Sequence, residues 1–460
     1  MQGRTAHESA NALADQLQQA TRLTDAVAIL WTWLEEQLDE LGSLQLNMPA
    51  VCAAARKRPF VKLDTAEIER LRHEPLVGAA ELLTRIARYM RKMSKGAATA
   101  GHANGFDGID VVVVWKRPDL AKFVGGGKEA PAAMEQPALE TIAPCLAVCP
   151  REIEKIELDV LRPSGTEWKA VNLLLAAGIG EPPTLSVHLD PLQHHGLTGW
   201  TQVGNPPVGW FDDAKIDKAD EENCVEAVRE AVAHACGPPA LLVMPELAAT
   251  QKVREALSDA LSDAIEKRRK PPVLSVIGLY HTPAPNGAVA PALRGATAQA
   301  SHVNEAIVLG PRGNELWRQQ KLSKAYGKSS SSSAASVPED IVVGRKLTIV
   351  PTLVGVITVA ICLDSFQARS RERLAHSGAD VILVPSLSPS VLRHRTSLGH
   401  LVQVLWAAAF VTNRGLPNGR RERSLWNGHS ARSFWAFQRR SVTVPPAWKR
   451  PDHPSFVFRP

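Results

Sequence analysis

The sequence lacks two features that would place it outside the cell interior or in a membrane. It has only six cysteines in 460 residues, and it opens without a basic and then apolar leader, so a disulfide scaffold is not indicated and free thiols in a reducing compartment are expected. No apolar run reaches the roughly 18 to 20 residues that a membrane-spanning helix needs. These absences predict a cytoplasmic protein with no membrane partner.

Most of the chain also lacks a large excess of positive or negative charge. Hydrophobic residues make up 45% and charged residues 22%, as in ordinary folded proteins rather than disordered ones. The net charge of +6 comes from the end, where residues 391–460 hold twelve Lys and Arg against Glu422 and Asp452. A basic tail can bind nucleic acid or can be a solvated extension, and both interpretations stay open.

The first 124 residues predict a mainly helical region of unknown role. Apolar residues recur every three or four positions through residues 8–45, as one helix or two short ones, and again through residues 76–90. Residues 109–115 indicate a buried strand. The Pro, Gly and Ala content of residues 125–150 is typical of a linker, which puts a domain boundary there.

From residue 151 the pattern changes to strands alternating with helices, which is typical of an α/β domain extending to about residue 415. A helix is predicted at 220–235 and another at 398–409, and residues 328–340, with five consecutive serines, predict a mobile surface loop. The Arg, Trp and Pro bias of residues 416–460 predicts a basic, disordered or truncated tail. Strands are predicted at 168–179, 184–190, 240–245, 273–280, 305–310, 353–361, 379–386 and 408–413.

Three chemically different side chains follow predicted core strands. Glu246 comes after A-L-L-V-M-P, Lys321 after a turn and a short second strand, and Cys362 after V-I-T-V-A-I. Ends of strands are where α/β sheets place their sites. An acid, an amine and a thiol in these positions predict one catalytic constellation.

The order of these groups resembles the nitrilase (carbon–nitrogen hydrolase) superfamily over residues 165–415. The resemblance rests on P-E-L after a strand, a lone lysine after G-x-x-x-W-R-Q-Q, and I-C-x-D after an apolar strand. Supporting matches are Asn223, Gly278, Gly313, Gly344 and V-T-N at 411–413. The resemblance implies a four-layer αββα sandwich, no metal or organic cofactor, and pairing into a homodimer.

The resemblance also implies a role for each residue. Cys362 would be the nucleophile and Glu246 its base, because a thiol attacks well only after losing its proton. Lys321 and the backbone N–H of Leu363 would hold the negative charge of the tetrahedral species, and Glu339 would position Lys321. The substrate would be a small amide, a carbamoyl or ureido compound, or a nitrile.

Some residues depart from the pattern of the superfamily. The aromatic residue that commonly follows the cysteine is Leu363 here, and the Arg-Phe-Pro run further on is replaced by S-F-Q-A. These departures leave the shape of the pocket open. An alternative of another class is that the domain is a binding or sensing module of a larger assembly, for example an anti-phage or nucleic-acid-associated one. A third alternative is an amide-transfer enzyme that passes ammonia or an acyl group to a second substrate.

Overall fold

The fold is described by a computed structural model that covers sixteen segments of the chain. Residues 1–152 with 351–356 form one compact unit, and residues 153–350 with 357–460 form the other. The segments are 6–41, 47–93, 111–115, 139–143, 146–177, 185–190, 192, 200–203, 207–284, 302–328, 336–388, 392–405, 407–413, 433–437, 442–443 and 455–458.

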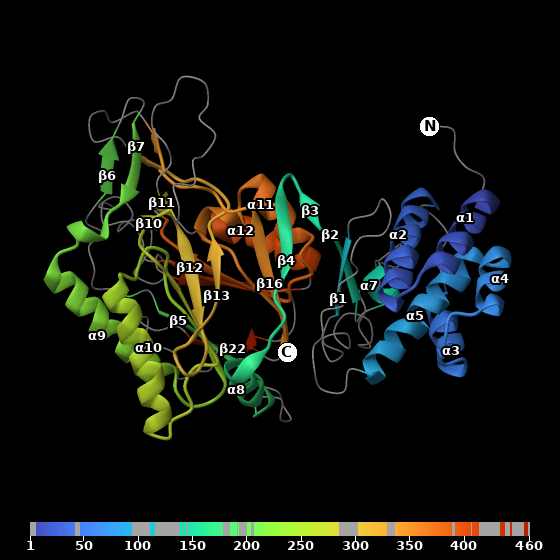
Figure 1. Ribbon diagram of the computed structural model, residues 1–460, viewed down its shortest axis with the longest axis horizontal. Helices are drawn as coiled ribbons and strands as arrows, with labels where there is room; N and C mark the ends of the chain where they lie inside the picture. The colour runs from blue at the N-terminus through green and yellow to red at the C-terminus, as the bar shows by residue number, and fades with distance from the viewer. Residues whose placement is uncertain are drawn as a thin grey trace. The chain divides into compact units, whose positions relative to one another are not determined.

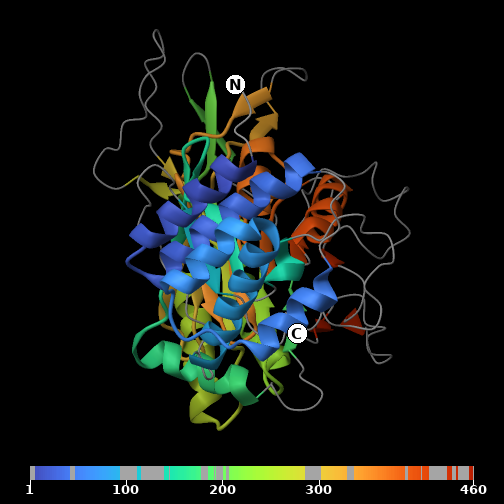
Figure 2. The ribbon, with the colours of Figure 1, turned by 90° about the vertical axis from the view of Figure 1, so that its right-hand side faces the viewer.

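The N-terminal unit is a helical bundle (Figure 1), which Figure 2 shows turned by 90°. The periodic pattern of residues 8–45 resolves into two helices rather than one, α1 and α2. Asn47 and Asp64 cap the next two helices by accepting hydrogen bonds from backbone N–H groups, which satisfies donors that a helix start leaves unpaired. The helices are α1 (Ala6–Gln19), α2 (Leu23–Leu41), α3 (Met48–Lys57), α4 (Thr65–His73) and α5 (Pro75–Met93).

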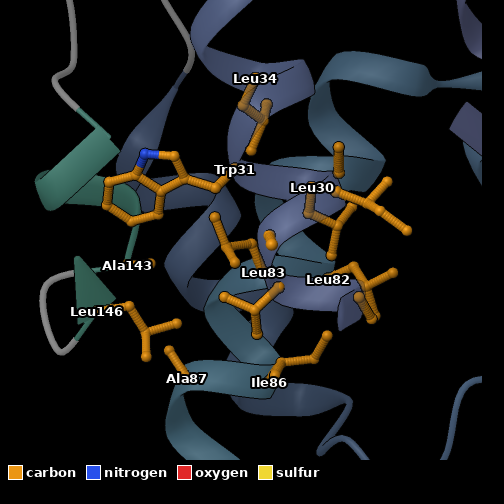
Figure 3. Packing of buried hydrophobic residues seen from close by; sticks show 14 of the residues in the cluster. Leu30, Trp31, Leu34, Leu82, Leu83, Ile86, Ala87, Ala143 and Leu146 are labelled. Carbon is orange, nitrogen blue, oxygen red and sulfur yellow. The ribbon is translucent and has the colours of Figure 1, made fainter. Parts of the chain in front are cut away.

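The core of this unit extends into the segment expected to be a linker. Residues 139–143 and 146–150 form α7 (Leu139–Ile142) and strand β2 (Leu146–Pro150), and β2 pairs with β1 (Val111–Trp115) in antiparallel register. Leu30 and Leu83 lie at the centre of the apolar cluster that includes Leu146 (Figure 3). The described part of residues 125–150 thus differs from the expected linker, because its apolar side chains complete a core that the helices leave open.

The second unit holds two seven-stranded sheets, ordered β13-β12-β9-β8-β5-β22-β21 and β20-β19-β18-β17-β16-β4-β3. The strands of the first sheet are β5 (Leu185–Leu189), β8 (Ala240–Val243), β9 (Leu274–Gly278), β12 (Glu305–Leu309), β13 (Glu315–Gln320), β21 (Val442–Thr443) and β22 (Ser455–Phe458). Those of the second are β3 (Glu152–Ile153), β4 (Ile156–Val160), β16 (Lys346–Thr352), β17 (Gly355–Val359), β18 (Val381–Ser386), β19 (Ala408–Asn413) and β20 (Ser433–Phe437).

The two sheets pack face to face, with a pair of helices on each outer side (Figure 1). Helices α9 (Lys218–Ala235) and α10 (Gln251–Glu266) cover β8, β9 and β12, and α11 (Ala368–Ala375) and α12 (Leu392–Leu405) cover the second sheet. Polar contacts join the sheets: the Thr412 hydroxyl donates to the Val243 carbonyl at 2.9 Å, and the Gln319 side chain donates to the Lys346 carbonyl at 2.9 Å and accepts from the Thr348 N–H at 3.0 Å. The predicted α/β, four-layer αββα sandwich is confirmed.

One predicted strand is wrong. Residues 165–177 form helix α8 (Gly165–Ala177), not a strand over 168–179. Its buried residues Trp168, Val171 and Leu175 recur every three or four positions, the spacing of one helix face. A long apolar run of Leu and Ala satisfies either period, and in the fold Trp168 stacks on Trp317 of β13, with the ring centroids 5.9 Å apart.

The tail also differs from expectation. Its described segments add strands to both sheets: β20 pairs with β19, and β22 pairs with β5, so the prediction of a disordered or truncated tail does not hold for them. These segments are rich in aromatic residues, which favour strands, and the pairing uses backbone groups that an edge would expose. Residues 414–432 and 444–454, with most of the basic side chains, lie outside the described residues.

The serine-rich segment is described at its two ends only. Strand β14 (Tyr326–Lys328) pairs with β15 (Ser336–Pro338), and Glu339 follows β15 as a buried residue. This pairing contradicts the predicted loop at 328 and 336–338, whereas residues 329–335 lie outside the described residues. The remaining short elements are β6 (Trp200–Val203), β7 (Val208–Phe211), η1 (Asp213–Lys215), β10 (Thr282–Pro283), β11 (His302–Val303) and η3 (Cys362–Ser365).

Candidate active site

Four polar side chains lie at the same end of the strands of the first sheet, because of the directions in which these strands pair. Strands β8 and β9 are parallel, so the residues after them, Glu246 and His281, leave at the same end. Strand β12 is antiparallel to β9, which places Asn304, just before β12, beside that end. Strand β13 returns antiparallel to β12 with Glu305 opposite Gln320, so Lys321 lies there as well.

The second sheet supplies the thiol in the same way. Strands β17, β18 and β19 are parallel, and Cys362 and Leu387 follow the first two. Cys362 begins η3 with a positive φ of 45°, a left-handed conformation that costs a non-glycine residue on the order of 1 to 2 kcal/mol. Such strain persists where the surrounding structure fixes it, and it gathers at functional sites.

Lys321 is the centre of the polar cluster. Its Nζ donates to Glu246 Oε1 at 2.7 Å and to Glu339 Oε2 at 2.9 Å. Glu339, which the sequence offered as the second glutamate, also accepts from the Ala325 N–H at 2.9 Å. Glu246 and Lys321 are each 1% exposed, so one ammonium is shared by two buried carboxylates.

Sequence reasoning missed two residues of this cluster. The Asn304 amide donates to Glu246 Oε1 at 2.9 Å and to Glu339 Oε1 at 2.8 Å, which duplicates the bridge made by Lys321. His281 accepts from the Phe211 N–H at Nδ1, so Nε2 carries the hydrogen and donates to Glu339 Oε1 at 2.7 Å. His281 follows the predicted strand 273–280 and Asn304 precedes the predicted strand 305–310, and those positions at strand ends were the available signal.

Leu387 connects the thiol to the carboxylate. Its N–H donates to Glu246 Oε2 at 3.1 Å, and its carbonyl accepts from the Cys362 thiol, with Sγ and O 3.6 Å apart. The loop that carries Leu387 is held by Asn413, whose side chain bonds both backbone groups of Ser388. This contact gives V-T-N at 411–413 a structural reason. Cys362 is 5% exposed.

Burial and charge act on these groups in different directions. Burial raises the pKa of the Cys362 thiol well above its usual range, Glu246 adds to this, and Lys321 only partly opposes it. Burial would lower the pKa of Lys321, but Glu246 and Glu339 together raise it well above its usual value. Burial would raise the pKa of Glu339, yet Lys321 and His281 hold it below its usual range. The cluster therefore rests as thiol, ammonium and a Glu339 carboxylate.

Asp364 is a buried acid without a full set of partners. The Leu322 N–H donates to its Oδ2 at 3.0 Å, while Oδ1 is buried with no hydrogen-bond partner among the described residues. Burial raises the pKa of Asp364 to about 7, and the Leu322 N–H and Lys321 offset only part of this. The folded protein thus keeps a proton on Asp364 that the unfolded chain has lost.

Asp364→Asn is expected to stabilise the protein at pH 8 and to leave its stability at pH 4 unchanged. A folded pKa above the unfolded value of 3.8 means that stability from this group is lost as pH rises from about 4 to about 7. The loss is about 1.4 kcal/mol per pH unit, so a few kcal/mol in all. Urea unfolding of both proteins at several pH values measures it, and a constant difference in free energy would contradict it.

Gly278 is packed against the backbone of Glu246. A Cβ at this position would lie 2.5 Å from Glu246 Cα and 2.9 Å from Leu247 N. Gly278→Ala is therefore expected to displace the carboxylate and to destabilise the protein by about 1 to 3 kcal/mol. Gly399→Ala in α12 is the matched control, because its Cβ meets nothing within 4 Å. In thermal unfolding, Gly399→Ala should keep or raise the midpoint, because alanine favours a helix more than glycine does. A midpoint of Gly278→Ala no lower than that of the unaltered protein would show that the close approach is unimportant.

Two further properties of the described residues bear on the site. No group of three or more His, Cys, Asp or Glu that could hold a metal ion occurs within the described segments. No helix of the part of the chain that the structure describes is long and apolar enough to cross a membrane.

Comparison with known proteins found similarity among solved structures. An amidase from Nesterenkonia sp. is 14% identical, with 60% of this chain and 89% of that chain covered and a TM-score of 0.33. A mutant of the Nesterenkonia AN1 amidase, described as from the nitrilase superfamily, is 15% identical, with 60% and 91% covered and a TM-score of 0.33. The superfamily that the sequence resembles is thus represented among them.

A larger enzyme was also found. The glutamine-dependent NAD+ synthetase from Acinetobacter baumannii is 16% identical, with 50% of this chain and 38% of that chain covered and a TM-score of 0.33. No protein-family model matches the sequence, and the search of curated proteins gave no match.

Proposed function

We propose that this chain is a nitrilase-type thiol hydrolase that cleaves a non-peptide C–N bond in an amide, a carbamoyl or ureido compound, or a nitrile. Cys362 is the nucleophile, Glu246 the base, and Lys321 the cation that stabilises the tetrahedral species. The observation that carries the proposal is the buried bridge from Lys321 Nζ to Glu246 and Glu339, at 2.7 and 2.9 Å, beside a thiol that shares Leu387 with Glu246.

The charges around the thiol support a coupled first step. Two carboxylates and one ammonium already leave the cluster with an excess negative charge, so a free thiolate would add a second one in a buried place. The thiol proton therefore passes to Glu246 as sulfur attacks the substrate carbon, and the negative charge moves on to the substrate oxygen or nitrogen. The raised pKa of Cys362 fits this order of events.

Lys321 has a donor to spare for that developing charge. An ammonium has three N–H groups, and the described residues provide two acceptors, Glu246 and Glu339. The third N–H and the backbone N–H of Leu363, the second residue of η3, would hold the substrate atom. Losing one such donor typically costs about 3 to 4 kcal/mol of transition-state stabilisation. Glu339 acts as a positioning residue, because it fixes the direction of the Lys321 side chain.

Glu246 would act twice more in the hydrolysis of an amide. It returns the thiol proton to the departing amine nitrogen as the C–N bond breaks, which leaves an acyl thioester on Cys362. It then takes a proton from water, whose oxygen attacks the thioester carbon, and gives that proton back to sulfur. One water is consumed, and a carboxylic acid and an amine are released.

The proposal is tested by a substrate screen with ammonia release as the measurement. Purified protein is incubated with primary amides, carbamoyl compounds and nitriles, and the peptide that contains Cys362 is analysed by mass spectrometry for an acyl adduct. We expect turnover of at least one class and an adduct on that peptide alone. If none of the three classes released ammonia, the proposal would be contradicted.

Four other points stay predictions: the homodimer, the nucleic-acid contact of the tail, the cytoplasmic location, and the alternative of a binding module.

A further inference from the structure

A second hydrogen-bonded chain of side chains also reaches the thiol, through Ser386 and His394, and has no role in the proposed reaction. Ser386 ends β18, and its Oγ lies 3.4 Å from Cys362 Sγ and 3.0 Å from His394 Nε2. His394 Nδ1 lies 2.7 Å from Ser365 Oγ, and this hydroxyl donates to the Cys362 carbonyl at 2.9 Å. Ser365, Ser386 and His394 are fully buried.

Counting hydrogens gives this chain a direction. A carbonyl oxygen only accepts, so the single hydrogen of the Ser365 hydroxyl goes to the Cys362 carbonyl. Ser365 Oγ can then only accept from His394, which places the imidazole hydrogen on Nδ1 and leaves Nε2 as an acceptor. Ser386 has one hydrogen for two acceptors, Nε2 and the sulfur.

His394 is suited to stay neutral in this place. It lies in the first turn of α12 (Leu392–Leu405), where the positive end of the helix dipole disfavours a cation. Burial lowers its pKa to about 4. Its ring also meets the edge of Phe366, with the ring centroids 4.9 Å apart.

We propose that Ser386 and His394 are positioning residues for the thiol: His394 holds the Ser386 hydrogen in the resting enzyme, and that hydrogen turns to sulfur as the thiol gives up its proton. The inference rests on Cys362 being the nucleophile of the proposed function. A hydrogen bond to a charged sulfur is stronger than one to a neutral nitrogen, which drives the turn. The sulfur therefore gains the hydrogen bond from Ser386 in the same step in which it loses its own proton.

Several charged groups surround the chain and are common to all the variants below. Glu246 and Lys321 act on the thiol, Asp364 lies on the same short helix, and the buried Arg373 belongs to α11, which packs against α12. Burial is the cause of the shift at His394. A difference between variants in the pKa of the Cys362 thiol is therefore due to the substituted serine, Ser365 or Ser386.

Two serine-to-alanine variants on opposite sides of His394 test the inference. Ser386→Ala removes the hydrogen that Ser386 offers to the sulfur, so the pKa of the Cys362 thiol should rise by about 1. Ser365→Ala frees His394 to carry its hydrogen on Nε2 and to donate to Ser386, which turns the Ser386 hydrogen to sulfur. The same pKa should then fall by about 1. Ser377→Ala, a buried serine that bonds Leu374 and Ala379, is the control.

The measurement is the rate of alkylation of Cys362 by iodoacetamide from pH 6 to 10, followed on its own peptide by mass spectrometry. At a pH below the thiol pKa, we expect about tenfold slower reaction in Ser386→Ala and about tenfold faster reaction in Ser365→Ala. Shifts of the same sign in both variants, as a merely structural role would give, or no shift in either, would overturn the inference.

The outcome is separable from that of the proposed function, because alkylation needs no substrate. Opposite shifts without amide turnover would leave the inference standing and reject the hydrolase. If either variant does not fold, a neutron structure of the unaltered protein decides the matter by the ring hydrogen of His394. A deuteron on Nδ1 is the expected result, and one on Nε2 would overturn the inference.

Discussion

Cys362→Ala is expected to lower turnover of any substrate found in the screen by at least about 10⁴-fold and to leave the fold intact. Alanine removes the sulfur that forms the thioester, and no other thiol of the described residues lies in the polar cluster. A thiol is a weak hydrogen-bond donor, so the lost contact with the Leu387 carbonyl, 3.6 Å between sulfur and oxygen, contributes little to stability. Activity should therefore disappear without a fall in the unfolding free energy.

A matched control is available in a second buried thiol. Cys224 in α9 donates to the Ala248 carbonyl at 3.3 Å and takes no part in the cluster. Cys224→Ala should keep turnover within about twofold while costing about 1 kcal/mol of stability. Steady-state kinetics and urea unfolding of both variants measure the contrast. Residual activity in Cys362→Ala equal to that of the control would remove the basis of the hydrolase proposal.

Lys321→Met is expected to abolish activity and also to destabilise the fold by about 3 to 5 kcal/mol. Methionine fills a similar space but leaves Glu246 and Glu339 facing one another without the shared ammonium. Removing one partner of a buried ion pair is costly, because the other charge stays buried without compensation. The activity loss should exceed about 10²-fold, since a donor to the tetrahedral species is lost as well.

A second substitution separates the two effects. Glu339→Gln added to Lys321→Met removes one of the two negative charges left without the ammonium and should restore part of the stability, but none of the activity. Urea unfolding and kinetics of the single and double variants form a double-mutant cycle. Recovery of activity along with stability would mean that Lys321 acts only through the fold, and that the substrate meets a different donor.

Much of the site was readable before the fold was known. Strand ends could be recognised from short apolar runs, and an acid, an amine and a thiol each followed one. Order along the chain, with the glycine-bounded turn before Lys321, was enough to suggest a superfamily and to name Glu339. Each of these patterns consists of consecutive residues and can be recognised without the fold, which is why Glu246, Lys321 and Cys362 could be selected.

Helix and strand assignments failed where one pattern fitted two structures. The apolar run of α8 satisfied both periods, and the tail carried a charge and proline bias that concealed β20 and β22. In both cases the deciding contacts come from residues far away in sequence. Residues 139–150 were misjudged for the same reason, because their partners β1 and α2 lie earlier in the chain.

The sequence by itself determined the class of fold and selected Glu246, Lys321 and Cys362 as candidates, since both depend on local composition and spacing. Only the tertiary structure decided that Asn304 and His281 complete the carboxylate cluster, that Leu387 links carboxylate to thiol, and that Ser386 connects the sulfur to His394. The physical reason is strand pairing. Parallel and antiparallel pairing brings the ends of strands that are distant in sequence to the same end of the sheet, and no short stretch of sequence determines which strand ends will meet.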